Sequence, residues 1–310
     1  MIMDSTQYTE ETDGFGNPNY DADAEYPLTN DADAVEAGKT AKLNGVYYDT
    51  VSDAIAAAEP GAEVTLLCDM TEPIRVPADA EIHLNLGDNA LTTAGTALVN
   101  DGVILSLTGG SIVSETGYGI SNRGTIGVLN TDVKSVKRDA IYNGSKEVAA
   151  VIEEIAGGSY QGHPDTYGSS TIGSFGLYNS SVSTVKLISG GTFQGSSVAI
   201  RNYGTIESVT GGRFECPYMD DNAHTFCDFS TVGNVYYNHA PLSVTGGTWY
   251  NGQAKGPKLS DGYRWEQGEI CTMTSGKRFV KYNSETQTRA HWVDDPAGAV
   301  YSYFTVVPEP

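Results

Sequence analysis

Apolar residues recur along this chain in short alternating runs separated by turn residues. The first runs lie at residues 64–68, 74–76, 82–86 and 90–92. Alternation of apolar and polar positions over about four to eight residues predicts half-buried β-strands. The runs follow one another too closely for a helix to fit between them. The pattern therefore predicts an all-β chain of short strands.

One short helix is predicted ahead of these strands. Thr50 is followed three residues later by Asp53, as in a capping box. Apolar residues then fall at positions 51, 54, 55 and 58, the spacing of one helical face, and Pro60-Gly61 ends the run. Residues 42–48 are predicted to form a short strand before the helix.

A four-residue unit ending in asparagine recurs from residue 97 onward. Each copy contains a small residue, an apolar residue, a variable residue and then Asn. The copies end at Asn100, Asn122, Asn143, Asn179 and Asn202, with a looser sixth copy at residues 235–238. The steps between successive asparagines are 22, 21, 36, 23 and 36 residues. A basic period of 21 to 23 residues with insertions in two coils is typical of a β-solenoid.

Glycine pairs form a second repeated element. They occur at 109–110, 157–158, 190–191, 211–212 and 246–247, and Asn130-Thr131 occupies the corresponding place in one coil. Glycine suits corners where the backbone needs positive φ or where stacked coils crowd one another. The recurring Asn suits a turn in which its amide stacks as a ladder on the Asn of the next coil.

The segment 47–66, with its short helix followed by the first strands, resembles the start of right-handed parallel β-helices of the pectin-lyase-like superfamily. The later Asn and Gly-Gly coils resemble β-helix modules of phage fibre and appendage proteins and of gut-bacterial surface proteins. The resemblance covers roughly residues 40–255. It implies a right-handed parallel β-helix with an N-terminal capping helix, and it leaves function open because this scaffold serves enzymes, adhesins and virion parts alike.

Charge divides the chain further. The 310 residues carry 18 basic and 39 acidic side chains, a net charge of −21, which disfavours nucleic-acid and membrane-surface binding. Ten of the carboxylates precede Lys39, where no basic residue occurs. Residues 1–38 are therefore predicted to be a flexible acidic arm. No signal peptide or membrane-spanning stretch is recognised.

The remaining chain divides at residue 255. Residues 39–255 are predicted to form the β-helix, and 256–310 a C-terminal β-rich cap over the last coil or an oligomer contact. Four cysteines without a CxxC motif indicate mostly reduced thiols, although Cys216 and Cys227 are spaced so that they could pair across a loop.

Catalytic and metal-binding patterns are weak. A pectinolytic hydrolase needs paired carboxylates; Asp132 and the pair Asp220-Asp221 are the only partial matches, and about 90 residues separate them. His224, Cys227 and His239 have ligand chemistry suited to zinc, without the paired spacing of a structural site. An exposed loop with incidental His and Cys explains these residues as well, and no cofactor is predicted.

Aromatic residues near the end of the repeats offer a binding hypothesis. Tyr236, Tyr237, Trp249 and Tyr250 are glycan-binding candidates if their rings are exposed, whereas rings stacked between coils would be structural.

Together these features favour a non-enzymatic attachment protein. We expect a phage virion appendage or a bacterial surface adhesin, located on a virion or cell surface, that binds host glycans. The acidic arm is expected to dock on the particle or cell, and the resemblance to fibre proteins implies a homo-oligomer such as a trimer. The alternative is a carbohydrate-active β-helix enzyme, either a polysaccharide lyase or a glycoside hydrolase.

Overall fold

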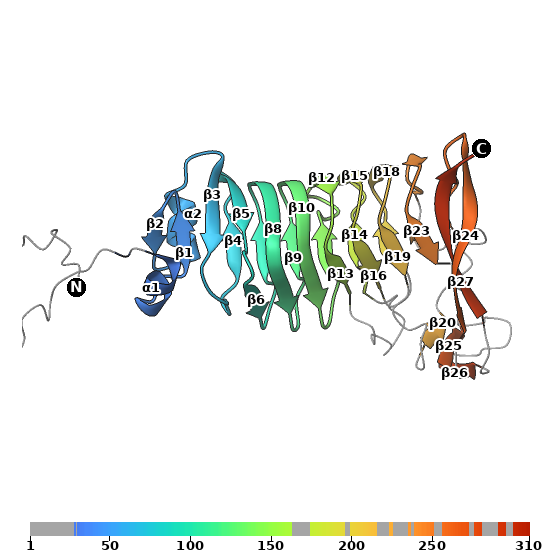
Figure 1. Cartoon of the computed structure of the whole chain (residues 1–310), viewed down its shortest axis with the longest axis horizontal. Coiled ribbons are helices and arrows are strands. Elements are labelled where there is room, and N and C mark those ends of the chain that lie inside the picture. The colour runs from blue at the N-terminus through green and yellow to red at the C-terminus, as the bar shows by residue number, and fades with distance from the viewer. Residues whose placement is uncertain are drawn as a thin grey trace, which may run out of the picture.

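The described part of the chain folds into a parallel β-solenoid of about 6 turns, which consists mostly of strands and has only two helices (Figure 1). The structure is a computed structural model. It describes residues 28, 30–162, 174–195, 199–215, 223–225, 235–236, 239–250, 256–272, 276–280, 291–295 and 300–310. The predicted all-β solenoid fold is confirmed.

Successive coils stack their strands in three parallel columns. The first column contains β3 (Ala62–Leu66), β5 (Glu81–Asn85), β8 (Val103–Ser114), β10 (Thr125–Ser135), β12 (Val151–Ile155), β15 (Thr184–Ile188), β18 (Thr205–Val209) and β22 (Ser243–Val244). The second column contains β6 (Ala90–Thr93), the C-terminal halves of β8 and β10, β13 (Ser159–Gln161), β16 (Thr192–Gln194), β19 (Arg213–Glu215) and β23 (Thr248–Tyr250). The third column contains β4 (Ile74–Val76), β7 (Leu98–Asn100), β9 (Ile120–Asn122), β11 (Ile141–Asn143), β14 (Leu177–Asn179), β17 (Ile200–Asn202) and β21 (Val235–Tyr236).

The asparagines of the repeat form a buried ladder along the third column. Each side-chain Nδ2 donates to the Oδ1 of the next asparagine at 2.8 Å, from Asn100 through Asn122, Asn143 and Asn179 to Asn202. All five side chains are fully buried. A buried amide is costly unless it is hydrogen-bonded, so the ladder fixes the register of every coil it joins.

The sixth repeat copy is wrong by one residue. Strand pairing sets Val235 opposite Ile200 and Tyr236 opposite Arg201, whereas the repeat assigned Tyr236 to the apolar position that Ile200 occupies. The ladder ends instead on the backbone, because Asn202 Nδ2 donates to the carbonyl oxygen of His239 at 2.8 Å.

The glycine pairs lie at the corners, as predicted, and the two members of a pair are glycine for different physical reasons. The second glycine has positive φ, as at Gly212 (φ 94) and Gly247 (φ 95). The first glycine touches the coil before it: a Cβ at Gly211 would lie 2.0 Å from the carbonyl oxygen of Ser189, and one at Gly246 1.9 Å from that of Thr210. Neither position accepts a larger residue without displacing backbone.

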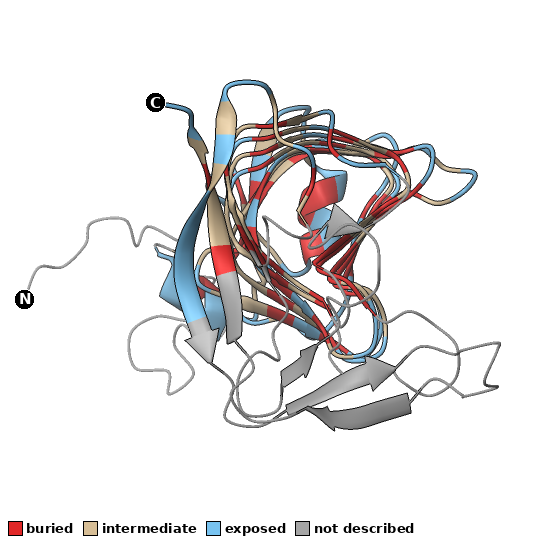
Figure 2. Ribbon diagram, turned by 90° about the vertical axis from the view of Figure 1, so that its right-hand side faces the viewer, coloured by how far each residue is buried: buried red, intermediate tan, exposed pale blue. Residues whose placement is uncertain are grey.

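The N-terminal end is closed by local elements. Helix α2 (Val51–Ala56) is capped by Thr50, whose Oγ1 accepts from the Asp53 amide at 3.0 Å, and its apolar side joins the core within the outline of the coils (Figure 2). Residues 42–48, predicted as one strand, form a hairpin of β1 (Ala41–Leu43) and β2 (Val46–Tyr48). The turn at Asn44-Gly45 has φ 50 and 82, the conformation that an Asn-Gly hairpin favours.

The C-terminal end of the acidic segment 1–38 forms a helix. Helix α1 (Asp31–Glu36) is capped by Asn30, and the Asp31 carboxylate accepts from Lys42 Nζ at 2.7 Å and from the Tyr47 hydroxyl at 3.0 Å. The predicted arm boundary at residue 38 is therefore too late. Residues 1–27 and 29 lie outside the described part.

The C-terminal segment pairs with the solenoid. Strand β27 (Val300–Pro308) runs antiparallel to β23 on one side and to β24 (Tyr263–Thr272) on the other. A separate small sheet contains β20 (Ala223–Thr225), β25 (Gly276–Val280) and β26 (His291–Asp295). Strand β27 thus covers the backbone edge of β23, which would otherwise be open to another chain.

Candidate functional site

The third column carries an outward row of aromatic and basic side chains. In each of its three-residue strands the first and third residues are buried, so the middle residue points outward. Strand register aligns these middle residues in one row of Arg75, Val99, Ser121, Tyr142, Tyr178, Arg201 and the backbone of Tyr236. The C-terminal half of this row is a candidate binding surface.

We call this surface the tyrosine–arginine face. It consists of Tyr118, Tyr142, Tyr178, Tyr203, Arg138 and Arg201. Tyr118 precedes β9 and stacks on Tyr142, with ring centroids 4.5 Å apart, and Tyr142 stacks on Tyr178 at 5.0 Å. Because the ring faces pack on one another, the half-buried tyrosines offer their edges and hydroxyls to solvent.

Partial burial raises the pKa of Tyr118, Tyr142 and Tyr178 above the usual phenol range. The three hydroxyls are therefore protonated at neutral pH. Each can donate as well as accept a hydrogen bond, as a sugar-binding surface requires.

An arginine stands near each end of the tyrosine ladder. The exposed Arg138 guanidinium lies 5.4 Å from the Tyr118 ring centroid, and its Nη1 is 3.4 Å from the Tyr118 hydroxyl. Arg201 lies 4.7 Å from the Tyr203 centroid and 6.0 Å from that of Tyr178, and its Nη2 donates to the Tyr203 hydroxyl. These cation–π contacts hold the two positive charges at the face.

Asp139 lies beside the face. Its Oδ1 accepts from the backbone amide of Phe175 at 2.8 Å. Burial raises the pKa of the Asp139 carboxyl to about 7, against the opposing effects of that hydrogen bond and of the Arg201 and Arg138 charges. Asp139 therefore changes charge near neutral pH, next to two arginines and three tyrosines.

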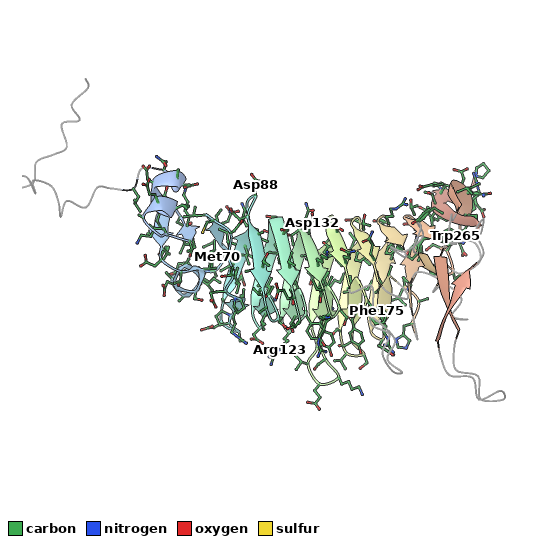
Figure 3. The ribbon with its side chains drawn as sticks, turned by 90° about the horizontal axis from the view of Figure 1, so that it is seen from below. Met70, Asp88, Arg123, Asp132, Phe175 and Trp265 are labelled. Atoms are coloured by element: carbon green, nitrogen blue, oxygen red, sulfur yellow. The ribbon has the colours of Figure 1, made fainter. Side chains whose placement is uncertain are left out.

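Of the predicted catalytic carboxylates, Asp132 alone is among the described residues. Asp132 is exposed, and its Oδ1 accepts from the Ser159 amide at 2.8 Å. Figure 3 shows Asp132 and Asp88 on the opposite side of the solenoid from Arg123 and Phe175. Asp220 and Asp221 lie outside the described residues.

The four predicted glycan-binding aromatics have different positions in the structure or lie outside its described part. Trp249 is fully buried and stacks on Phe214 with centroids 3.8 Å apart, so its assignment as a glycan-binding residue is wrong. It ends an internal stack of Tyr160, Phe193 and Phe214. The backbone of Tyr236 continues the outward row beyond Arg201, and Tyr250 lies in β23. Tyr237 is not among the described residues.

The weak metal candidates do not form a described site. His239 is exposed, and its Nδ1 lies 3.1 Å from the carbonyl oxygen of Gly204. His224 lies in β20, and Cys227 falls outside the described part, as does Cys216, its predicted pairing partner. Within the described ranges, no three His, Cys, Asp or Glu residues gather as a metal site would need.

A hydroxyl–imidazole pair occupies a strand irregularity on the first column. His83 Nδ1 lies 2.7 Å from Ser106 Oγ, where β8 has one more residue than β5 between paired positions. Such bulges often re-aim side chains. Glu63 is opposite His83 in register, but its carboxylate accepts from the Thr65 hydroxyl at 3.4 Å. The pair lies on a different column from the tyrosine–arginine face.

The face was overlooked in the sequence because its residues occupy the variable position of the repeat. Tyr142 and Tyr178 each precede the repeated Asn, and Arg201 stands at the same place in the next copy. Their in-register alignment was therefore predictable. Asp139 and Tyr118 gave no such signal, since their contacts depend on how the corner folds.

No known family model, curated protein or solved structure matches this chain. The fold assignment therefore rests on the coil geometry itself.

In the part of the chain that the structure describes, no helix has the length and apolar character needed to cross a bilayer.

Proposed function

We propose that this protein is a non-enzymatic attachment protein of a virion appendage or a bacterial surface, which binds host-surface glycans through the tyrosine–arginine face. The observation that carries the proposal is the outward row in which Tyr118, Tyr142 and Tyr178 stack. Amphipathic aromatic residues and arginine are enriched at recognition surfaces, where rigid rings bind with little loss of conformational entropy.

The scaffold supports this role mechanically. A solenoid held by a continuous amide ladder gives a stiff, extended element, and each coil contacts only its neighbours. Kinship with the pectin-lyase-like superfamily and with phage fibre modules belongs to the same proposal, supported by the helix that precedes the first coil. Docking through the acidic arm and a trimeric assembly are further parts of it.

Binding to an immobilised glycan panel tests the proposal. We expect the full chain to bind at least one host-surface glycan, and Tyr142→Ala combined with Tyr178→Ala to remove that binding because both hydroxyls and the ladder are lost. Val99→Ala, at the same row position in β7, is the matched control and should bind as the wild type does. Equal binding by the double variant would exclude the face as the site.

A glycoside hydrolase remains the second candidate, and Asp139 is the observation that favours it. A carboxyl group with a pKa of about 7 can act as a general acid at neutral pH. Release of reducing sugar from the bound glycan, lost in Asp139→Asn, would establish the hydrolase and overturn the non-enzymatic proposal.

A further inference from the structure

The two central hydroxyls of the tyrosine ladder are available to a ligand. The hydroxyls at its ends, on Tyr118 and Tyr203, contact arginine side chains. Those of Tyr142 and Tyr178 make no hydrogen bond to any residue that the structure describes. Neither oxygen is a buried unpaired atom, so both reach solvent. Each can therefore donate a hydrogen bond to a ligand and accept one from it.

The ladder stands above its own strands as a ridge. Residues two positions before and after an outward residue share its side of a strand. For Tyr142 and Tyr178 these neighbours are all small, namely Ala140, Gly144, Gly176 and Ser180. None of the four has a side chain long enough to stand beside a tyrosine ring, so the hydroxyls lie along the top of the ridge.

The ridge is straight and evenly spaced. The ring centroids of Tyr118 and Tyr142 are 4.5 Å apart, and those of Tyr142 and Tyr178 are 5.0 Å apart. The row runs along the solenoid axis, because the stacking of strands sets that axis (Figure 1). A ligand that contacts all three rings must therefore be extended in this direction and present one polar group for each coil.

Extended chains of β-linked pyranoses have this form. Each sugar unit advances the chain by nearly one strand spacing of about 4.8 Å and carries hydroxyls on its edges. A chain that winds into a helix, as α-linked glucose does, leaves the line of the ridge after one or two units. The net charge of −21 repels anionic polysaccharides at long range, so a neutral chain suits this molecule better.

We propose that the tyrosine–arginine face binds a neutral, extended polysaccharide of β-linked pyranoses, which lies along the ridge with one sugar unit at each of Tyr118, Tyr142 and Tyr178. This inference rests on the proposed glycan-binding function and names its ligand class. Sugar hydroxyls pair with the tyrosine hydroxyls, which donate or accept as each unit requires.

Calorimetric titration of the full chain with two series of glucose oligosaccharides tests the inference. Cello-oligosaccharides are β-linked and extended, whereas malto-oligosaccharides contain the same sugar in a helical chain. We expect the cello series to bind about tenfold more tightly at equal length, because it reaches one or two more hydroxyls. Its affinity should rise up to about three units, one for each stacked tyrosine, and should change little with salt.

Variants that keep the rings isolate the hydroxyls. Tyr142→Phe combined with Tyr178→Phe retains the stacked rings and removes the two central hydroxyls, so affinity for the cello series should fall about tenfold. Tyr48→Phe, in the half-buried part of β2 at the N-terminal hairpin, is the matched control and should leave affinity unchanged. Thermal unfolding of each variant verifies folding. Unchanged affinity in the double variant would overturn the hydroxyl contacts.

Failure of the inference and failure of the proposed function give different results. If malto-oligosaccharides bind as tightly as the cello series, or if only charged or branched glycans of the panel bind, the ligand class is wrong. Loss of that binding in the Tyr142→Ala and Tyr178→Ala double variant would still place glycan binding at the face. If no oligosaccharide and no glycan of the panel binds, both proposals are wrong.

Discussion

At the scale of single residues, the fold depends on positions where local packing or backbone conformation allows only one type of residue. Gly211 must lack a Cβ because the Ser189 carbonyl oxygen occupies that space, whereas Gly212 must tolerate φ 94. Asp139 follows a different logic, since burial raises its pKa and two arginines oppose that effect. Its contribution to stability therefore depends on pH.

We expect the free energy of unfolding to fall as pH rises from 4 to 7 through Asp139. Its folded pKa of about 7 exceeds the usual aspartate value of 3.8, so the folded protein keeps a proton that the unfolded chain releases. This stabilisation is complete below the unfolded pKa and is lost as pH passes through the folded pKa.

Chemical denaturation of the wild type and Asp139→Asn at several pH values measures this effect. Asn keeps an oxygen for the Phe175 amide but does not titrate. The stability of the wild type relative to this variant should decline up to pH 7 and then level off. Asp88→Asn, an exposed control, should show no such trend; a flat difference for Asp139→Asn would refute the assignment.

At the scale of elements, repeated local patterns predicted most of the structure, and contacts between coils decided the rest. Residues close together in the sequence determine the capped helix, the first strands and the glycine corners. These elements could therefore be predicted from the sequence. The Asn44-Gly45 hairpin was also visible as a turn signal and was overlooked. The buried position of Trp249 could not be predicted from the sequence, because aromatic residues favour strands whether they face inward or outward.

The asparagine ladder is the element whose loss should be most costly. Asn143→Ala removes the acceptor of Asn122 Nδ2 and the donor to Asn179 Oδ1, both fully buried. Asn122 Nδ2 still donates to the Val151 carbonyl oxygen at 3.1 Å, so the main cost is the unsatisfied Asn179 Oδ1, which should lower the free energy of unfolding by about 1–3 kcal/mol.

Urea unfolding measures this loss, with Ser121→Ala as the control. Ser121 points outward from the adjacent strand β9, and its removal should change stability by less than about 0.5 kcal/mol. A loss for Asn143→Ala no larger than that of the control would show that the ladder contributes little to stability.

At the scale of the whole molecule, the two ends determine whether the solenoid stays separate from its copies. A stack of parallel strands always has two backbone edges, and here β27 pairs with β23 at one of them. Its Tyr303 and Val306 side chains are buried as well.

Deleting residues 300–310 should therefore promote self-association, because the edge of β23 and buried apolar surface become exposed together. Light scattering after size exclusion compares the deleted form with the full chain, and we expect a larger and heterogeneous species. Removal of the exposed residues Glu309 and Pro310 alone is the control. An unchanged mass for the longer deletion would show that β27 does not protect this edge.

The asparagine ladder has one further consequence, which concerns length. All its amides point the same way, each Nδ2 toward the following coil, so any coil can succeed any other without reversing a donor or an acceptor. A unit of 21 to 23 residues can therefore be duplicated or lost while the remaining asparagines still meet. Gain or loss of one coil therefore changes the length of the solenoid by one strand spacing of about 4.8 Å.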